Sequence, residues 1–181
     1  AANVSRETLD RLTAYAELLV KWNPAINLVS KASLDSLWSR HMLDSVQVFR
    51  SISSPAGLWA DLGSGGGFPG LVVAILAIES APDLQVVLVE SDTRKAAFLS
   101  TVARATGAKV RVIADRIEKV APLGCDIISA RALAPLVDLL GYADLHLKPG
   151  GTAIFPKGAT AAAEIDAARR LWRFDLVTLR S

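Results

Sequence analysis

The spacing of apolar residues changes near residue 55, and this change divides the chain into two parts. In the first part, apolar positions follow the i, i+3, i+7 spacing of one helix face: Leu9, Leu12, Ala16, Leu19 and Val20. The pattern predicts a helix over residues 5–22, ended by Asn23-Pro24, and a second helix over residues 33–50. We therefore expect residues 1–54 to form a helical cap on the rest of the chain.

After residue 55, short apolar runs alternate with helical segments. Residues 86–89 are apolar without interruption, which is typical of a parallel strand covered by helices on both faces. Strands are predicted over residues 57–61, 85–90, 110–114, 126–129, 151–156 and 173–179, and helices over residues 68–78, 93–106, 132–145 and 160–172. The order indicates a doubly wound α/β body over residues 55–181 and, with the cap, a single domain over residues 1–181.

The composition excludes several classes of protein. With 181 residues, 51% of them hydrophobic, the chain has enough apolar surface for its own core, which excludes a disordered protein. The longest apolar run, residues 71–78, is far shorter than the about 20 residues that span a bilayer, so we expect a cytoplasmic protein without a membrane partner. One cysteine and two histidines do not make a Cys/His zinc site, so no metal is expected. Cys125 is expected to pack in the core.

A glycine-rich segment lies between the first predicted strand and the helix after it. Asp61 is followed by Gly63, Gly65 and Gly67 in the order D-x-G-x-G-x-G. The sixth position after Gly63 is Phe68, so the dinucleotide fingerprint G-x-G-x-x-G is not matched, and no Gly-Lys-Ser or Gly-Lys-Thr follows as in a P-loop. The segment resembles motif I of class I S-adenosylmethionine-dependent methyltransferases. This resemblance implies their Rossmann-like α/β fold, here with an N-terminal helical cap, and S-adenosyl-L-methionine as cofactor.

Acidic residues end the next two predicted strands. Glu90 ends the second strand, where a carboxylate can accept hydrogen bonds from ribose hydroxyls. Asp115, Ile117 and Glu118 follow the third strand, where methyltransferases of this class hold the adenine. Because the carboxyl ends of parallel strands meet at one edge of a sheet, we expect these residues to converge on one cofactor, together with Asp61.

The segment after the fourth predicted strand narrows the choice of methyl acceptor. Enzymes that methylate an exocyclic amine carry Asp/Asn-Pro-Pro-Tyr/Phe there, whereas this chain has Ser-Ala-Arg-Ala-Leu over residues 129–133. A cysteine nucleophile would also follow that strand, but Cys125 lies at its start. An acceptor such as guanine N7 fits better, because its lone pair requires no general base. Arg131 is the residue we assign to catalysis, holding the cofactor carboxylate or a substrate phosphate.

Motifs along nearly the whole chain resemble one family, the bacterial small-subunit ribosomal RNA methyltransferase G, also called glucose-inhibited division protein B. The motifs are Lys21-Trp22-Asn23-x-x-x-Asn27-Leu28, Arg40-His41-x-Leu43-Asp44-Ser45, the glycine segment with Phe68-Pro69-Gly70, Arg94-Lys95-x-x-Phe98-Leu99, Ile128-Ser129-x-Arg131-Ala132 and Lys157-Gly158. The family implies methyl transfer to N7 of guanine 527 in 16S ribosomal RNA.

The same resemblance implies roles for individual residues. It makes Gly63, Phe68, Ile117, Glu118 and Arg131 cofactor contacts. For the substrate, we assign Asn27 and Arg40 in the cap and Lys157 after the fifth predicted strand. His41 is expected to be a half-buried histidine with its hydrogen bonds satisfied.

The charge of the chain limits how it can contact RNA. Twenty basic and eighteen acidic side chains leave a net charge of +2, so any RNA surface must be a local patch. Candidate cations are Arg94, Lys95, Lys109, Arg111, Arg116, Lys157 and the group Arg169, Arg170 and Arg173 around Trp172. We expect a monomer that binds 16S ribosomal RNA within the small ribosomal subunit. Two alternatives stay open, namely a methyltransferase of this class with another RNA, protein or small-molecule acceptor, and a binding module that senses NAD.

Overall fold

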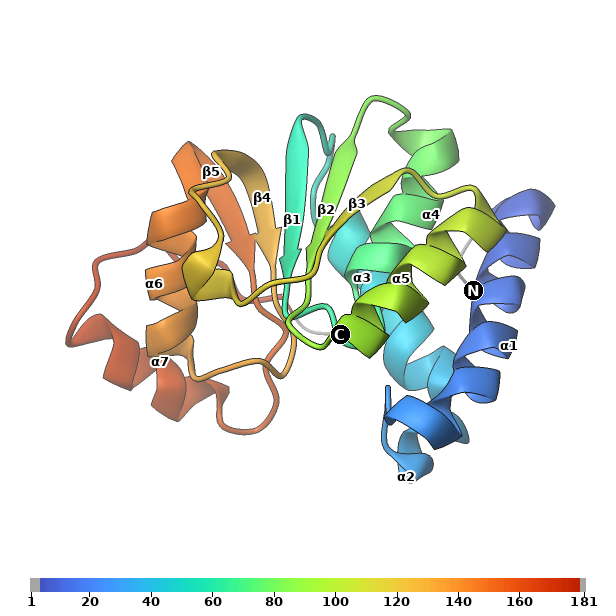
Figure 1. Cartoon of the computed structure of the whole chain (residues 1–181). Helices are drawn as coiled ribbons and strands as arrows, with labels where there is room; N and C mark the ends of the chain where they lie inside the picture. The colour runs from blue at the N-terminus through green and yellow to red at the C-terminus, as the bar shows by residue number, and fades with distance from the viewer. Residues whose placement is uncertain (1–3, 180–181) are drawn as a thin grey trace.

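A computed structural model describes residues 4–179 of the chain, and its centre is one parallel sheet. Every neighbouring pair of strands is parallel, and the order is β3-β2-β1-β4-β5 (Figure 1). The strands are β1 (Leu58–Leu62), β2 (Gln85–Val89), β3 (Val110–Ile113), β4 (Cys125–Ser129) and β5 (Leu147–Ile154). The chain moves outward from β1 to β3 and then returns to the other side of β1. This reversal leaves a crevice at the carboxyl ends of β1 and β4, where open α/β sheets bind ligands.

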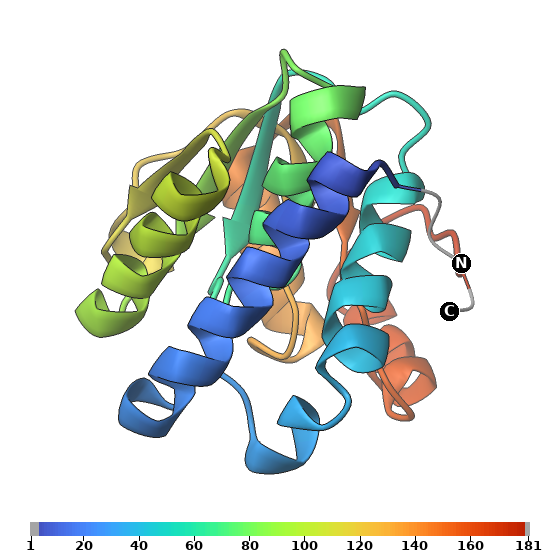
Figure 2. The ribbon, with the colours of Figure 1, turned by 90° about the vertical axis from the view of Figure 1, so that its right-hand side faces the viewer.

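Helices cover the two faces of the sheet unequally. Successive residues of a strand point to opposite faces, so Trp59 packs in one apolar cluster and Ala60 in another. The cluster around Trp59 takes in side chains of α1 (Arg6–Ile26), α3 (Leu43–Arg50), α4 (Gly70–Ser80) and α5 (Thr93–Thr106). The opposite face carries α6 (Leu136–His146), and α7 (Ala161–Arg169) packs on α6. In Figure 2, α1 and α3 both lie over the first face, and each of them packs on α4. The doubly wound prediction is confirmed, and the cap shares one apolar cluster with the sheet.

The first helix is longer than predicted. It continues through Pro24 to Ile26 and ends at Asn27, which has the left-handed φ of 50°. The buried Asn23 explains the exit of the chain, because its Oδ1 accepts hydrogen bonds from the backbone N–H groups of Leu28 and Val29, both at 2.8 Å. The predicted end at Asn23-Pro24 is therefore wrong by one turn, and the asparagine amide, more than the proline, directs the chain after the helix.

The second predicted helix is divided by a turn at residues 35–36. The short α2 (Lys31–Leu34) precedes this turn, and after it the π-helical turn η1 (Trp38–Met42) continues without a break into α3. In η1 the N–H of Leu43 donates to the carbonyl of Trp38, which is the wider i→i+5 spacing of a π-helix. The prediction of one regular helix over residues 33–50 is wrong, because the helix is interrupted at residues 35–36 and widens in η1. The wider turn changes which side chains face the sheet.

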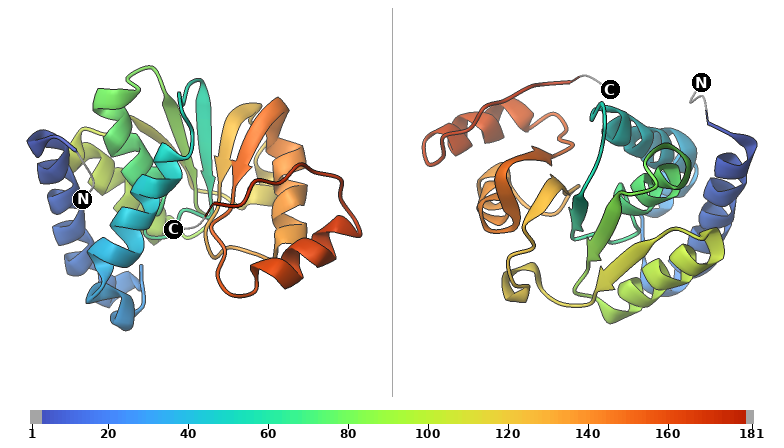
Figure 3. Two further views of the ribbon diagram at one scale, coloured as in Figure 1. Left: turned by 180° about the vertical axis from the view of Figure 1, so that it is seen from behind. Right: turned by 90° about the horizontal axis from the view of Figure 1, so that it is seen from above.

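Two further predictions differ from the structure. Residues 173–179 are not a strand, and Leu176, Val177 and Leu179 are 42%, 82% and 67% exposed, so their alternating pattern has no sheet face to pack on. Figure 3 shows this segment running from α7 towards α3 without joining the sheet. The helix predicted from residue 132 begins at Leu136, because Ala132 has a left-handed φ of 52° and Pro135 precedes the first turn. Cys125 is fully buried, as predicted.

Candidate active site

A cavity of about 810 Å³ lies at the carboxyl ends of the strands. This is within the range of about 300–1,000 Å³ that is usual for small-molecule and cofactor sites. Its wall comes from the loops that follow β1, β2, β3 and β4 and from the cap. Eight of the residues assigned from the sequence line it: Gly63, Gly65, Phe68, Glu90, Asp115, Ile117, Glu118 and Arg131. The convergence predicted for the strand ends is therefore present.

The glycine loop after β1 depends on backbone conformations that other residues rarely adopt. Gly63 has a φ of 64°, and a Cβ there would lie 2.6 Å from Cδ1 of Leu133. Gly67 has a φ of 96°, and a Cβ there would lie 2.7 Å from the hydroxyl of Tyr15. Gly63 forms part of the cavity wall, whereas Gly67 lies outside it. Gly67 thus packs closely against α1 outside the cavity wall, and the cofactor contact that motif I implies for it stays a prediction.

Asp61 lies behind the cavity wall and not in it. The side chain is fully buried; its Oδ1 accepts from the hydroxyl of Ser129 at 2.7 Å and its Oδ2 accepts from the N–H of Gly70 at 3.3 Å. Burial raises the pKa of Asp61 to about 6, against the opposing effect of these hydrogen bonds. The prediction that Asp61 contacts the cofactor is not supported, because both its oxygens tie β1 to β4 and to the start of α4.

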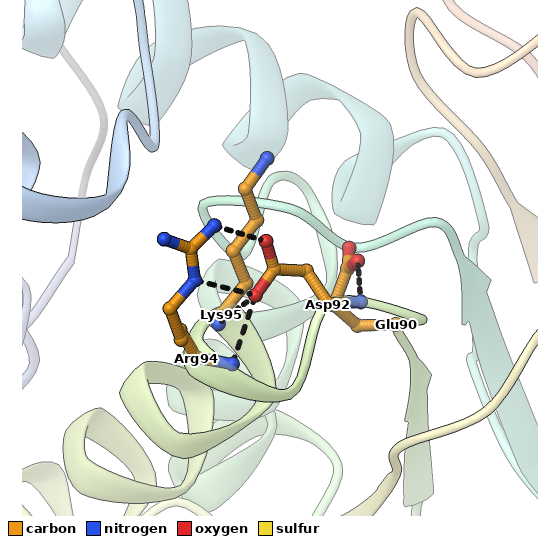
Figure 4. Close-up of polar contacts among 4 residues, drawn as sticks. All are labelled: Glu90, Asp92, Arg94 and Lys95. Carbon is orange, nitrogen blue, oxygen red and sulfur yellow. Dashed lines mark hydrogen bonds and ion pairs between the residues drawn. The ribbon is translucent and has the colours of Figure 1, made fainter.

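Glu90 connects two of the loops around the cavity. Its carboxylate accepts from the N–H of Gly65 at 2.7 Å. It also accepts from the N–H of Asp92 at 2.8 Å, as Figure 4 shows. Asp92 in turn caps α5 and pairs with Arg94 at 2.9 Å, and this pairing lowers the pKa of Asp92 to about 2. Each oxygen of Glu90 has a second lone pair, so the carboxylate can still accept from ribose hydroxyls. Arg94 is occupied by Asp92, whereas Lys95 lines the cavity.

Tyr142 of α6 completes the wall beside the third loop. Its hydroxyl donates to Oε1 of Glu118 at 2.7 Å, and this bond lowers the pKa of Glu118. Ile117 is buried beside them in η2 (Ile117–Lys119) and supplies an apolar surface. Tyr142 was not among the residues predicted from the sequence. The one feature of the sequence that could have indicated it is an aromatic residue on the helix that follows the fourth strand.

Arg131 lies between the sheet and the cap. Its Cζ is 5.1 Å from the ring centroid of Phe68, and its Nη1 donates to the carbonyl of Arg40 at 3.3 Å. Phe68 also stacks on Tyr15 of α1 and on His41 of η1, with centroids 5.2 Å and 5.0 Å apart. Burial lowers the pKa of Arg131, although the guanidinium stays charged near neutral pH. The predicted position of Arg131 in the cleft is confirmed.

His41 is half-buried as predicted, but its hydrogen bonds are not satisfied. Both ring nitrogens are buried and have no hydrogen-bond partner among residues 4–179. Burial, followed by the positive charges of Arg131 and Arg40, lowers its pKa to about 4. The imidazole in the cavity wall is therefore neutral at pH 7.

The three residues assigned to the substrate do not line the cavity. Asn27 and Arg40 are exposed on the cap, and Arg40 contributes its backbone carbonyl to Arg131. Lys157 pairs with Glu164 at 2.7 Å and donates to the carbonyl of Ala134 at 2.8 Å, so it is not a free cation. The prediction that Lys157 meets a phosphate is not supported by this arrangement. The cap instead contributes lining residues that the sequence did not reveal: Leu28, Val29, Ser30 and Ser33.

Two negative observations apply to residues 4–179. No helix there combines the length and the hydropathy that a membrane span requires. No group of three or more His, Cys, Asp or Glu side chains in this part of the chain could hold a metal ion.

The fold and the site define a class I S-adenosylmethionine-dependent methyltransferase. The chain resembles the crystal structure of a putative S-adenosyl-L-methionine-dependent methyltransferase from Methanococcus maripaludis, with a TM-score of 0.55 and 13% sequence identity, over 94% of this chain and 73% of that chain. It also resembles the crystal structure of an S-adenosylmethionine-dependent methyltransferase from Aquifex aeolicus, with a TM-score of 0.57 and 15% identity, over 77% of this chain and 88% of that one. These likenesses confirm the predicted fold class.

Sequence relatives narrow the class to one family. Residues 8–181 match the GidB family, described as rRNA small subunit methyltransferase G. A protein of Ruegeria pomeroyi named ribosomal RNA small subunit methyltransferase G is 58% identical, over 97% of this chain and 87% of that protein. A protein of the same name from Paramagnetospirillum magneticum is 56% identical, over 94% of this chain and 81% of that protein. The chain belongs to the rRNA small subunit methyltransferase G family, as its motifs predicted.

Proposed function

We propose that this chain transfers the methyl group of S-adenosyl-L-methionine to N7 of guanine 527 in 16S ribosomal RNA. We infer further that it acts as a monomer, in the cytoplasm, on RNA assembled in the small ribosomal subunit. The name of its relatives, at 58% identity over most of both chains, supports the RNA substrate. One structural observation carries the proposal: a single cavity brings together Glu90, the Glu118–Tyr142 pair and the guanidinium of Arg131.

The cavity fits the chemical groups of S-adenosylmethionine. The free lone pairs of Glu90 suit the two hydroxyls of a ribose, and Ile117 offers an apolar surface to the flat face of an adenine. Arg131 is positively charged and suits the carboxylate of the methionine part. When bound, this cofactor supplies an electrophilic methyl group on a sulfonium sulfur.

The protein side chains bind and orient, and no proton transfer is required of them. Guanine N7 has a lone pair in the plane of the base and carries no proton, so approach and alignment suffice. The ring nitrogens of His41 are buried, and we assign the remaining lone pairs of Glu90 to the ribose, so neither residue is given the role of a general base. Methylation also gives the base a positive charge, and a neutral His41 in the cavity wall does not oppose it.

Asp61 and Gly67 act in this proposal as positioning residues. Asp61 holds the ends of β1 and β4 at the right separation through Ser129, and Gly67 lets Tyr15 approach the glycine loop. Neither touches the cofactor. Asn27 is an exposed residue at the end of α1, and we keep its assignment to the substrate. Lys157 pairs with Glu164 and thereby holds the loop before α7.

Methyl transfer to small ribosomal subunits tests the proposal directly. Subunits from cells that lack the gene are incubated with the protein and radiolabelled S-adenosylmethionine, and the rRNA is digested to nucleosides. We expect label in 7-methylguanosine, at one position of 16S rRNA. Absence of label from the rRNA would overturn the RNA substrate. Calorimetry with S-adenosylhomocysteine and with NAD tests the cofactor separately, and binding of NAD alone would contradict the assignment of the cavity.

A further inference from the structure

The π-helical turn η1 presents different side chains to the cavity and to solvent. His41 lines the cavity and Met42 is buried in the core. Trp38 and Leu43, in contrast, are 44% and 41% exposed. The N–H of Leu43 donates to the carbonyl of Trp38, so the two residues are one π turn apart and are neighbours on the surface of the turn. We call Trp38 and Leu43 the η1 patch.

The η1 patch lies on the same turn as His41, a residue of the cavity wall. Ser33, before the turn, and His41, within it, both line the cavity. Arg131 reaches from the cavity wall to the carbonyl of Arg40. In Figure 1 the cap segment with α2 lies at the end of the molecule towards which the strand arrows point, which is the end that holds the cavity. The patch therefore shares one short turn with a residue of the cavity wall, although neither Trp38 nor Leu43 lines the cavity itself.

Positive charge accompanies the apolar surface. Arg40 is exposed two residues after Trp38, and Lys95 lies in the cavity wall at the start of α5. In Figure 4 the side chain of Lys95 extends away from the Asp92–Arg94 ion pair. Exposed aromatic rings and cations together bind unpaired nucleotides, because bases stack on the rings and phosphates meet the charges.

We propose that the η1 patch binds an unpaired base of the RNA substrate, next to the guanine that enters the cavity. Enzymes that act on a base remove it from its stack, and its neighbours then lose a stacking partner. Trp38 replaces that partner, Leu43 packs beside the same base, and Arg40 contacts the adjoining phosphate. This inference rests on the proposed function, because it takes RNA as the substrate.

Substitution of Trp38 tests the proposal, with two comparison variants. Trp38→Ala removes the ring, whereas Trp38→Phe keeps a smaller one. Leu9→Ala is the matched control, since Leu9 is 47% exposed near the beginning of α1, at the opposite end of that helix from the cap turn. For each protein, binding to undermethylated small subunits is measured by filter retention, methyl transfer by radiolabel, and binding of S-adenosylhomocysteine by calorimetry.

We expect Trp38→Ala to weaken subunit binding by about fivefold to a hundredfold, the range measured for loss of one stacked base. Trp38→Phe retains most of the affinity, Leu9→Ala binds as the unsubstituted protein does, and all variants bind S-adenosylhomocysteine equally. Equal subunit binding by Trp38→Ala and the unsubstituted protein overturns the inference, as does an equal loss in Leu9→Ala. A change of oligomeric state in Trp38→Ala, with subunit binding intact, would assign the patch to a protein contact instead.

The measurements distinguish a failure of this inference from a failure of the proposed function. If subunit binding depends on Trp38 but the rRNA is not labelled, the proposed methyl acceptor is contradicted, whereas the η1 patch remains an RNA-binding surface. If the rRNA is labelled but subunit binding does not depend on Trp38, only the proposal for the η1 patch is overturned. If the unsubstituted protein neither binds nor labels the subunits, both proposals fail.

Discussion

The candidate active site has two walls that differ in how they are held. On the sheet side, Glu90, Ile117 and Arg131 follow the ends of strands, and backbone ladders fix where those ends lie. On the cap side, His41 and the segment from Leu28 to Ser33 come from irregular or π-helical backbone. The cap wall is held by individual side chains, notably the amide of Asn23 and the ring of Phe68.

The difference indicates that the two walls have different functions, one in binding the cofactor and the other in recognising the substrate. Groups suited to a cofactor shared by many enzymes lie on the sheet wall, where the strand ends fix the starting points of their loops. The cap wall borders the mouth, where a particular substrate must be recognised. Substitutions on the sheet wall should therefore affect cofactor binding and catalysis, and those on the cap wall should leave cofactor binding nearly intact.

Arg131→Ala gives the largest expected effect, because Arg131 connects the two walls. We expect kcat/KM for methyl transfer to fall by about a hundredfold or more, as is typical when one charged group is lost from an active site. The free energy of unfolding should change little, since the guanidinium makes one long hydrogen bond of 3.3 Å and one ring contact. Steady-state kinetics and urea denaturation measure the two quantities. Transfer at the unsubstituted rate would remove Arg131 from the catalytic site.

Gly63→Ala should disturb the sheet wall, because it strains the backbone of the glycine loop. The residue has a φ of 64°, and the new Cβ would approach Leu133 to 2.6 Å. A left-handed conformation costs an alanine about 1–2 kcal/mol, and the close contact adds to it, so we expect a loss of about 2–3 kcal/mol in the free energy of unfolding. Binding of S-adenosylhomocysteine should weaken as well.

Gly158→Ala is the matched control for that substitution. No atom lies within 4 Å of the position where its Cβ would be built. We expect this variant to equal the unsubstituted protein in urea denaturation and calorimetry. A similar loss in both variants would show that the geometry of the glycine loop is not the cause.

The two walls also differ in how far the sequence could predict them. Glu90 and Ile117 were assigned because strand ends can be located from apolar runs, and a parallel sheet brings those ends together. The cap wall could not be assigned in the same way. The turn at Leu28 depends on the Asn23 amide, and the π spacing of η1 changes which residues face inward, and neither follows from helical periodicity. Lys157 shows a third limit, because its partner Glu164 comes from the next helix and only the folded chain reveals the pair.

Asn23→Ala should have a smaller effect, confined to the cap wall. Its amide oxygen accepts from two buried N–H groups, those of Leu28 and Val29, and removal leaves both without this partner. We expect a loss of about 1–2 kcal/mol in the free energy of unfolding, near the usual cost of unsatisfied buried groups. Affinity for S-adenosylhomocysteine should fall only a few fold, because the sheet wall is intact. A loss of cofactor binding as large as that of Gly63→Ala would contradict the division between the walls.

A pH dependence of stability is also expected, and it arises at His41. In the unfolded chain this histidine binds a proton below a pKa of about 6.5, whereas in the folded protein its pKa is about 4. Between these values the unfolded state binds more protons, so the free energy of unfolding should fall as the pH is lowered through that window. The buried carboxyl of Asp61 acts in the opposite direction, because its pKa is raised to about 6, and His146 acts in the same direction as His41.

His41→Phe isolates the contribution of His41 from those other groups. The new ring can still stack on Phe68, but it does not titrate. Urea denaturation at about pH 7.5 and about pH 5 gives the pH-dependent change for each protein, and the changes from Asp61 and His146 cancel when the two proteins are compared. We expect the unsubstituted protein to lose more stability on acidification than His41→Phe does. An equal loss would mean that the His41 ring turns and finds a partner when it is protonated, so that the cap wall, in contrast to the sheet wall, rearranges with pH.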